Sequence, residues 1–128
     1  MKRTMLTGGL LAGACLVLVW GCQRAEEPEV SYSKDVRPIL EKNCMECHVE
    51  GAAGYEASGF SMATYEDLMK GTKFGAVIKP GDSLTSALTM LVEGRADPSI
   101  QMPHGKEPLT EEEIATLKTW VEQGAKNN

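Results

Sequence analysis

The run Cys44-Met45-Glu46-Cys47-His48 constrains this chain more than any other stretch. Two cysteines separated by two residues, with a histidine directly after the second, form the attachment sequence of a c-type haem. Thiols at this spacing can face one edge of a porphyrin and add to its two vinyl groups. The histidine then lies under the ring, where a neutral imidazole nitrogen can bind the iron. The motif therefore predicts one covalent haem c on Cys44 and Cys47, with His48 as the proximal iron ligand.

Two other kinds of site contain a Cys-x-x-Cys pair. A structural zinc site needs about four ligands, and the chain has no second pair of cysteines at this spacing. A redox dithiol of the thioredoxin type follows a strand and opens a helix, whereas Cys44 and Cys47 close a segment with a helical pattern. Both comparisons favour haem attachment.

The amino-terminal segment is typical of a signal peptide. Lys2 and Arg3 precede an apolar run over residues 6–20, which is short for a membrane span of about 20 apolar residues. The run ends in Val19-Trp20-Gly21-Cys22, a pattern that resembles the processing site of bacterial lipoproteins. Ordinary cleavage after a small residue and an uncleaved anchor are the alternatives. We predict a lipoprotein-type signal peptide over residues 1–21 and lipidation of Cys22.

The predicted organisation after the signal peptide is a polar tether over residues 22–30, a mono-haem domain over 31–125 and a short tail over 126–128. Export agrees with the haem motif, because c-type haem is generally attached outside the cytoplasm. We therefore expect the protein on the periplasmic side, anchored to a membrane through lipid on Cys22. Gln23, in place of an aspartate, favours the outer membrane if the cell has one.

The charge balance excludes one class of partner. The chain has 18 acidic and 13 basic side chains and a net charge of −5, so we expect no binding to nucleic acid. A redox partner protein with a basic docking patch is electrostatically favoured. Solubility is an equally simple explanation of the acidity.

The apolar pattern predicts helices and no strand. Asp35 can cap a first helix with Pro38 in its opening turn. A short helix is expected over residues 64–71 and another around Leu84, Leu88 and Leu91, with loops over 50–59 and 93–108. The final helix begins with a capping box and ends at a glycine. We predict an all-α domain whose first and last helices cross and bury a common core formed by Ile39, Leu40, Leu117 and Trp120.

The second iron ligand is less tightly defined. The candidates are Met62, Met69, Met90, Met102 and His104. Met102 is favoured because Pro103 stiffens its loop, and His104 in the same loop is the main rival. Met69 and Met90 lie in helical patterns and are more simply core residues. Met62 remains an alternative as the second ligand. An iron with no second protein ligand is a further alternative.

These residues resemble a small class I c-type cytochrome, and within that class the planctomycete-type cytochrome c domain. The similarity covers residues 31–125 and includes the segments YSKDVRPIL (32–40), VIKPGD (77–82), QMP (101–103) and WVEQGA (120–125). It implies His48 and Met102 as the axial pair and a role in electron transfer or redox sensing. Members of this family are often one domain of a larger chain.

One departure from the class concerns the proximal histidine. Class I cytochromes usually have a proline soon after this histidine, in a segment whose carbonyl binds the other ring nitrogen. No proline occurs here between His48 and Pro80, so the partner of that nitrogen is not predicted.

The leading functional hypothesis is a membrane-tethered carrier of single electrons. We expect no enzymatic activity, since Glu111, Glu112 and Glu113 are better explained as charges at a helix N-terminus than as an acid–base set. One alternative is a haem-based sensor or gas-binding module with an open or displaceable distal ligand. Another is a non-catalytic haem subunit of a larger redox complex.

Overall fold

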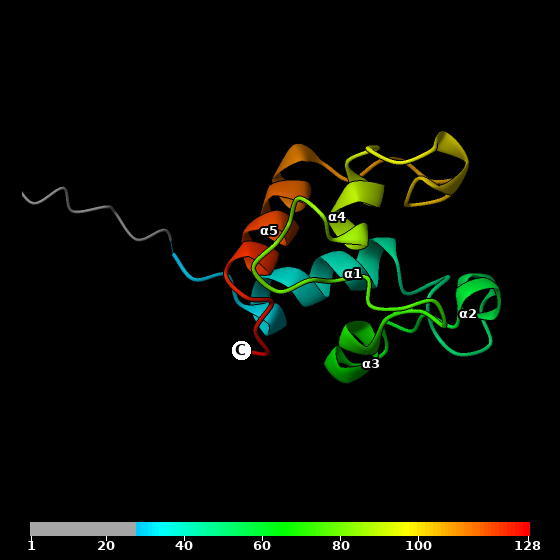
Figure 1. The fold of residues 1–128 in the computed structure, drawn as a ribbon, viewed down its shortest axis with the longest axis horizontal. Helices are drawn as coiled ribbons and strands as arrows, with labels where there is room; N and C mark the ends of the chain where they lie inside the picture. Colours follow the sequence, from blue (N-terminus) through cyan, green and yellow to red (C-terminus); the bar gives the residue numbers. More distant parts are fainter. Residues whose placement is uncertain (1–27) are drawn as a thin grey trace, which may run out of the picture.

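The computed structural model describes residues 28–128, so the signal peptide predicted over 1–21 and the lipid site at Cys22 lie outside the described residues. Within the described part the chain is helical, with an isolated bridge between Thr72 and Gly75 and no strand. The elements are η1 (Tyr32–Val36), α1 (Arg37–Asn43), α2 (Ala53–Ser58), α3 (Tyr65–Lys70), α4 (Ala87–Val92), η2 (Pro98–Ile100) and α5 (Glu111–Glu122) (Figure 1). The expectation of an all-helical domain is confirmed at this level. No helix of residues 28–128 is long and apolar enough to cross a membrane.

The first helix opens with a π-helical turn because of Pro38. Proline has no N–H to donate, and its ring crowds the carbonyl four residues earlier, which favours a wider turn. Val36 N–H accordingly donates to the Ser31 carbonyl and Arg37 N–H to the Tyr32 carbonyl. The helical segment therefore begins at Tyr32, before the predicted cap at Asp35, whose carboxylate instead accepts from Ser31 N–H at 2.8 Å.

Two helices have the ends that their sequences predict. In α3 the Thr64 side chain accepts from Asp67 N–H, and the helix stops at Gly71. In α5 Thr110 and Glu113 form a reciprocal capping box. These boundaries depend on side chains within one turn of the helix, which is why local sequence is sufficient to place them.

Two other segments differ from prediction. The loop expected over residues 50–59 contains α2, a six-residue helix with no side-chain cap that ends at Gly59 in the left-handed region. The helix expected around Leu84 begins only at Ala87, with Ser86 as its N-cap, and Leu84 is 70% exposed. Both differences arise where tertiary contacts, and not local capping, determine the helix.

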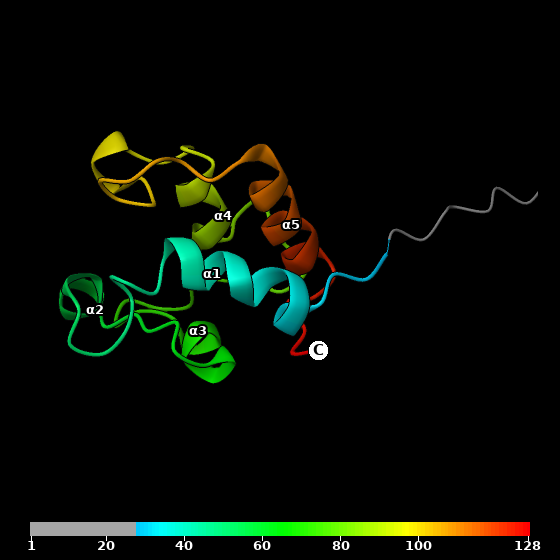
Figure 2. The same cartoon turned by 180° about the vertical axis from the view of Figure 1, so that it is seen from behind.

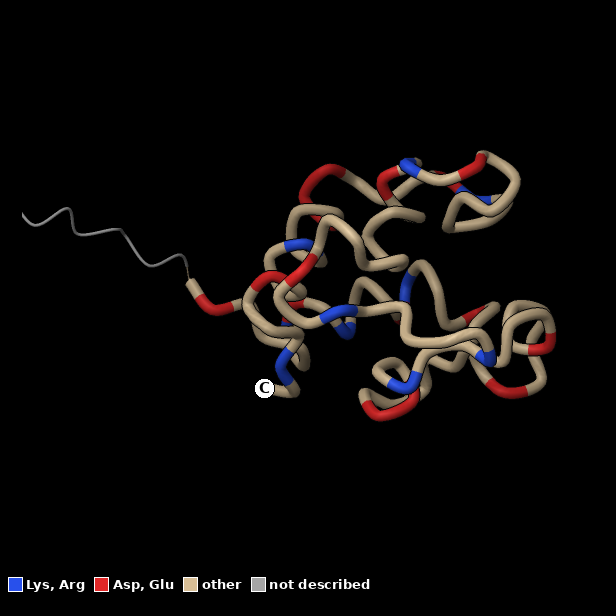
Figure 3. The backbone as a smooth tube through the Cα atoms, in the orientation of Figure 1, with Lys and Arg blue, Asp and Glu red and all other residues tan. Residues whose placement is uncertain are grey.

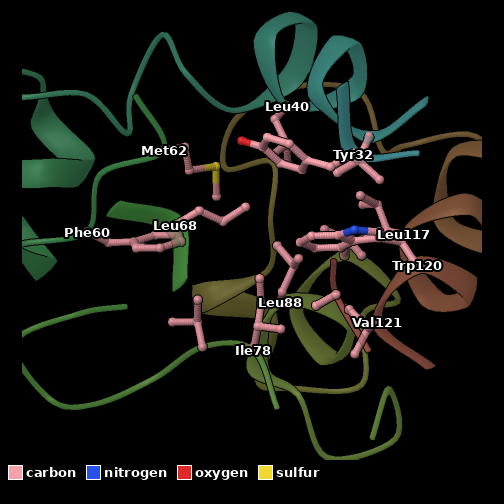
Figure 4. Packing of buried hydrophobic residues seen from close by; sticks show 14 of the residues in the cluster. Tyr32, Leu40, Phe60, Met62, Leu68, Ile78, Leu88, Leu117, Trp120 and Val121 are labelled. Carbon is pink, nitrogen blue, oxygen red and sulfur yellow. The ribbon is translucent and has the colours of Figure 1, made fainter. Parts of the chain in front are cut away.

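The core joins the first and the last helical elements of the described residues. Tyr32 from η1 packs against Trp120 from α5, with ring centroids 5.6 Å apart, and against Tyr65 at 5.1 Å. Leu40, Leu117 and Trp120 are buried in one apolar cluster, and Ile39 is partly buried against it (Figure 4). The predicted core residues therefore do share one cluster. Helix α5 contacts η1 and α4; the predicted crossing of the terminal helices stays a prediction.

The two ends of the described chain are held together by hydrogen bonds. Asn128 accepts from Tyr32 N–H through its side chain at 2.8 Å and from Ser33 N–H through its carbonyl at 3.0 Å. Val30 N–H donates to the Gln123 side chain at 2.8 Å. We call this set of contacts the terminal clasp. It lies at the end of the molecule away from α2 (Figures 1 and 2).

Candidate haem site

A cavity of about 460 Å³ opens beside the Cys-x-x-Cys-His segment. Its wall includes the end of α1, α2, α4 and the loop that follows η2. Most of the lining side chains are apolar, among them Phe60, Val77, Leu88, Val92 and Ile100. The volume lies within the range of about 300–1,000 Å³ typical of sites for organic ligands and cofactors.

Backbone hydrogen bonds turn the motif towards this cavity. Cys44 N–H continues α1 by donating to the Leu40 carbonyl at 2.9 Å. Cys47 N–H and His48 N–H then both donate to the Cys44 carbonyl, at 3.1 and 3.0 Å, which closes a tight turn. Both cysteines are partly buried with free thiols, and both line the cavity together with His48.

The end of α1 is also fixed from the side by α5. The Glu113 carboxylate accepts from Lys42 Nζ at 2.9 Å and from Asn43 Nδ2 at 3.3 Å. Asn43 is the residue directly before the motif and lines the cavity. The capping box of α5 thereby anchors the segment that carries the two thiols.

The two nitrogens of His48 lie in different surroundings. Nδ1 is fully buried and has no hydrogen-bond partner, which leaves Nε2 as the nitrogen that can bind a group inside the cavity. Burial lowers the pKa of His48, while the Phe60 backbone partly opposes this shift. A neutral imidazole is the form that binds iron.

Lys106, from the loop before α5, supplies a positive charge near the two thiols. Burial raises the pKa of Cys44 to about 11, and the nearby Lys106 acts against this shift. Lys106 forms an ion pair with Glu46, which lies between the cysteines. This contact joins the loop after Met102 to the motif. Elsewhere acidic and basic residues alternate along the described chain, with an acidic stretch where α5 begins (Figure 3).

Three of the five candidates for the second iron ligand line the cavity. They are Met62, Met102 and His104. Met102 is partly buried and donates its N–H to the Leu91 carbonyl at 3.3 Å, whereas His104 is exposed. Met62 is buried, and its N–H donates to the His48 carbonyl at 2.7 Å. Met69 and Met90 are not among the lining residues. Met69 is partly buried against the core cluster, whereas Met90 is partly buried but does not belong to that cluster.

The residues present fit a haem c. The chain supplies a free thiol pair, an imidazole with a buried Nδ1 and thioether side chains around one apolar cavity. The zinc alternative lacks its ligands, because residues 28–128 contain no cluster of three or more His, Cys, Asp or Glu side chains suited to a metal ion. In this site Cys44 and Cys47 would hold the porphyrin and His48 the iron.

A small helical domain with this motif on the wall of an apolar cavity has the features of a c-type cytochrome. The family model described as Planctomycete cytochrome C matches residues 44–104, which include the whole motif, Met102 and His104. The resemblance predicted from the sequence is thus confirmed, and a cytochrome c domain implies covalently bound haem c and haem-based electron transfer. No curated protein and no solved structure is significantly similar to the chain.

Sequence reasoning missed the residues that surround the imidazole. Gly54 of α2 and Phe60 both contact the ring of His48. Neither residue belongs to a motif, and both lie in or next to the segment expected to be a loop. The Gly- and Ala-rich composition of that segment was the available signal, since small residues allow a close approach of backbone to a neighbouring group.

Proposed function

We propose that this protein is a membrane-tethered, mono-haem c-type cytochrome that carries single electrons between redox partners. The observation that carries the proposal is the placement of Cys44, Cys47 and His48 on one wall of a cavity that Met102 also lines. When bound there, haem c supplies a reversible one-electron iron couple.

The protein's own residues explain why a carrier is favoured over an enzyme. His48, through Nε2, and Met102, through its thioether, would both hold the iron. A thioether favours the reduced metal and excludes small molecules. The apolar cavity wall limits access of water, which reduces the reorganisation that accompanies electron transfer.

The first experiment asks whether haem is attached. The full chain would be produced in a host competent for c-type maturation, purified and analysed by intact mass spectrometry. We expect the added mass of one haem, a low-spin visible spectrum, a near-infrared sulfur-to-iron band and no response to carbon monoxide. A purified protein without added haem mass would end the proposal.

A second candidate function is a haem-based sensor or gas-binding module. The specific observation in its favour is that Met62, Met102 and His104 line the same cavity, so that one protein ligand could replace another. Rapid formation of a carbon monoxide complex by the reduced protein would favour this candidate over the carrier.

The tether and the partner form the last part of the proposal. Lipidation at Cys22 would anchor the protein to a membrane on the periplasmic side, and the acidic chain would favour a redox partner with a basic docking patch. Because several buried acyl chains hold a protein far more strongly than one, we expect Cys22→Ala to move the protein to the soluble fraction. Cys15→Ala, also upstream of the domain, is the control and should leave the fractionation unchanged.

A further inference from the structure

Gly54 lies directly against the imidazole of His48. A Cβ placed on Gly54 would lie 2.7 Å from the Cys47 carbonyl oxygen, 2.8 Å from His48 Cε1 and 3.0 Å from His48 Nδ1. These distances are too short for carbon contacts, so a larger residue fits only if α2 or the ring moves. Gly54 is not among the glycines with positive φ. The requirement for glycine at this position therefore comes from space and not from backbone conformation.

Backbone hydrogen bonds hold this contact in place. Tyr55 N–H, one residue after Gly54, donates to the Cys47 carbonyl at 3.0 Å. Met62 N–H donates to the His48 carbonyl at 2.7 Å. The segment from α2 to Met62 is thus attached to the motif at both ends and cannot slide away from the ring without breaking these bonds.

Phe60 provides a second contact to the same ring. The centroids of the Phe60 and His48 rings lie 5.4 Å apart, with 59° between their planes. Nδ1 itself is buried without a hydrogen-bond partner. A histidine that binds metal usually has its ring orientation fixed by a hydrogen bond at its other nitrogen. In this protein the Phe60 backbone interacts with the imidazole without completing that hydrogen bond, and the contacts with Gly54 and the Phe60 ring restrict the rotation of the imidazole.

We propose that Gly54 is a positioning residue for the proximal histidine. Its backbone and the Phe60 ring orient the His48 imidazole by direct contact, so that Nε2 faces the cavity. This inference rests on the proposed function, in which His48 binds the iron.

The proposal predicts that Gly54→Ala lowers the stability of the protein, whereas helix propensity alone predicts that it raises it. Replacing glycine by alanine inside a helix normally stabilises the protein. At Gly54 the added methyl group would push against His48 and the Cys47 carbonyl, and the imidazole would rotate or shift. The orientation of the axial imidazole determines the distribution of unpaired spin over the oxidised porphyrin, so its rotation is visible without any assay of function.

The test compares alanine substitutions at one glycine inside α2 and at the glycine that caps it, in the haem-loaded full chain. Gly54→Ala meets the imidazole. Gly59→Ala changes the C-cap of α2, where φ is +70° and the nearest atoms to the new methyl are those of Lys73 at 3.6 Å. The measurements are haem content by mass, thermal stability, reduction potential and the paramagnetic NMR shifts of the haem methyl groups.

We expect both variants to unfold at lower temperature, but only Gly54→Ala to change the spread of the methyl shifts and the reduction potential. The inference is wrong if Gly54→Ala gives the wild-type pattern, or if both variants change it alike, because a general loosening of α2 would then explain the result. Wild-type protein without haem would instead defeat the proposed function.

A second variant covers the case in which Gly54→Ala does not retain haem. Phe60→Leu keeps an apolar side chain but removes the aromatic contact to His48. It should carry haem and show altered methyl shifts. If Phe60→Leu leaves the shifts at their wild-type values, packing does not orient the ring and the inference fails.

Discussion

At the scale of single residues, the proposed function assigns Met102 as the second iron ligand. We expect Met102→Ala to lower the reduction potential and to allow carbon monoxide to bind, because water or hydroxide neither stabilises ferrous iron nor blocks the site as a thioether does. Met102→His should keep a six-coordinate spectrum but also lower the potential. Potentiometric titration and visible spectroscopy of the reduced protein would measure both effects.

His104→Ala is the matched control, because His104 lines the same cavity but is exposed. Its spectrum should stay close to that of the wild type. Loss of low-spin character in His104→Ala, together with its retention in Met102→Ala, would assign two histidines as ligands. No effect in either variant would point to Met62 or to an open site.

The thiols of Cys44 and Cys47 are the second test at this scale. Either alanine variant can form only one thioether bond, so we expect haem retention to be weakened or abolished. His48→Ala should give an unstable protein, since the iron loses its proximal ligand. Met45→Leu, between the cysteines and similar in volume, should attach haem normally. Denaturing gels stained for haem would distinguish these results, and equal staining of all four variants would contradict the assignment.

A site residue could be predicted from the sequence only where its contacts are with residues close to it along the chain. Cys44, Cys47 and His48 follow from spacing, because their chemistry is set within one turn of chain. The choice among Met62, Met102 and His104 depends on how distant loops meet at the cavity. Gly54 and Phe60 escaped prediction entirely, since their contacts with His48 exist only after α2 has packed on the motif.

At the scale of the helices, the capping residue Glu113 of α5 is expected to make the stability of the fold depend on pH. Hydrogen bonds from Lys42 and from Thr110 N–H hold the pKa of Glu113 at about 2, below its ordinary value of 4.5. Because the pKa is lower in the folded state, the ionised carboxylate stabilises the fold above about pH 4.5, and this contribution is lost as the pH falls towards 2.

We therefore expect Glu113→Gln to lower the free energy of unfolding by about 1 kcal/mol at pH 7. The difference from wild type should shrink as the pH falls through this window. Urea unfolding followed by circular dichroism at several pH values would measure it. Glu111→Gln, an exposed residue in the same first turn, is the control. A constant difference between Glu113→Gln and wild type down to pH 2 would contradict the prediction.

The helices also show why secondary structure was only partly predictable. The ends of α3 and α5 are encoded by threonine caps and were predicted correctly. Helix α2 has no side-chain cap and only six residues, so it depends on its hydrogen bond to Cys47 and its contact with His48. The leucine spacing that placed Leu84 in a helix does not distinguish an exposed turn residue from a core one.

For the whole molecule, the terminal clasp should contribute to global stability. Asn128→Ala removes the acceptor of the partly buried Tyr32 N–H, and an unmade hydrogen bond of this kind costs about 1 kcal/mol. We expect a matching decrease in the free energy of unfolding, measured by urea titration. Asn127→Ala, whose side chain is exposed, is the control. Equal stability of both variants would show that the clasp does not close the fold.

The clasp has a further consequence for the architecture of longer proteins. It brings the two ends of the described chain together at the end of the molecule away from α2 (Figures 1 and 2), whereas α2 is one of the elements that line the cavity. A domain whose ends are adjacent can be inserted at one site of a host polypeptide, so that the rest of its surface does not contact the host. Adjacent ends therefore suit insertion of this unit into a longer polypeptide.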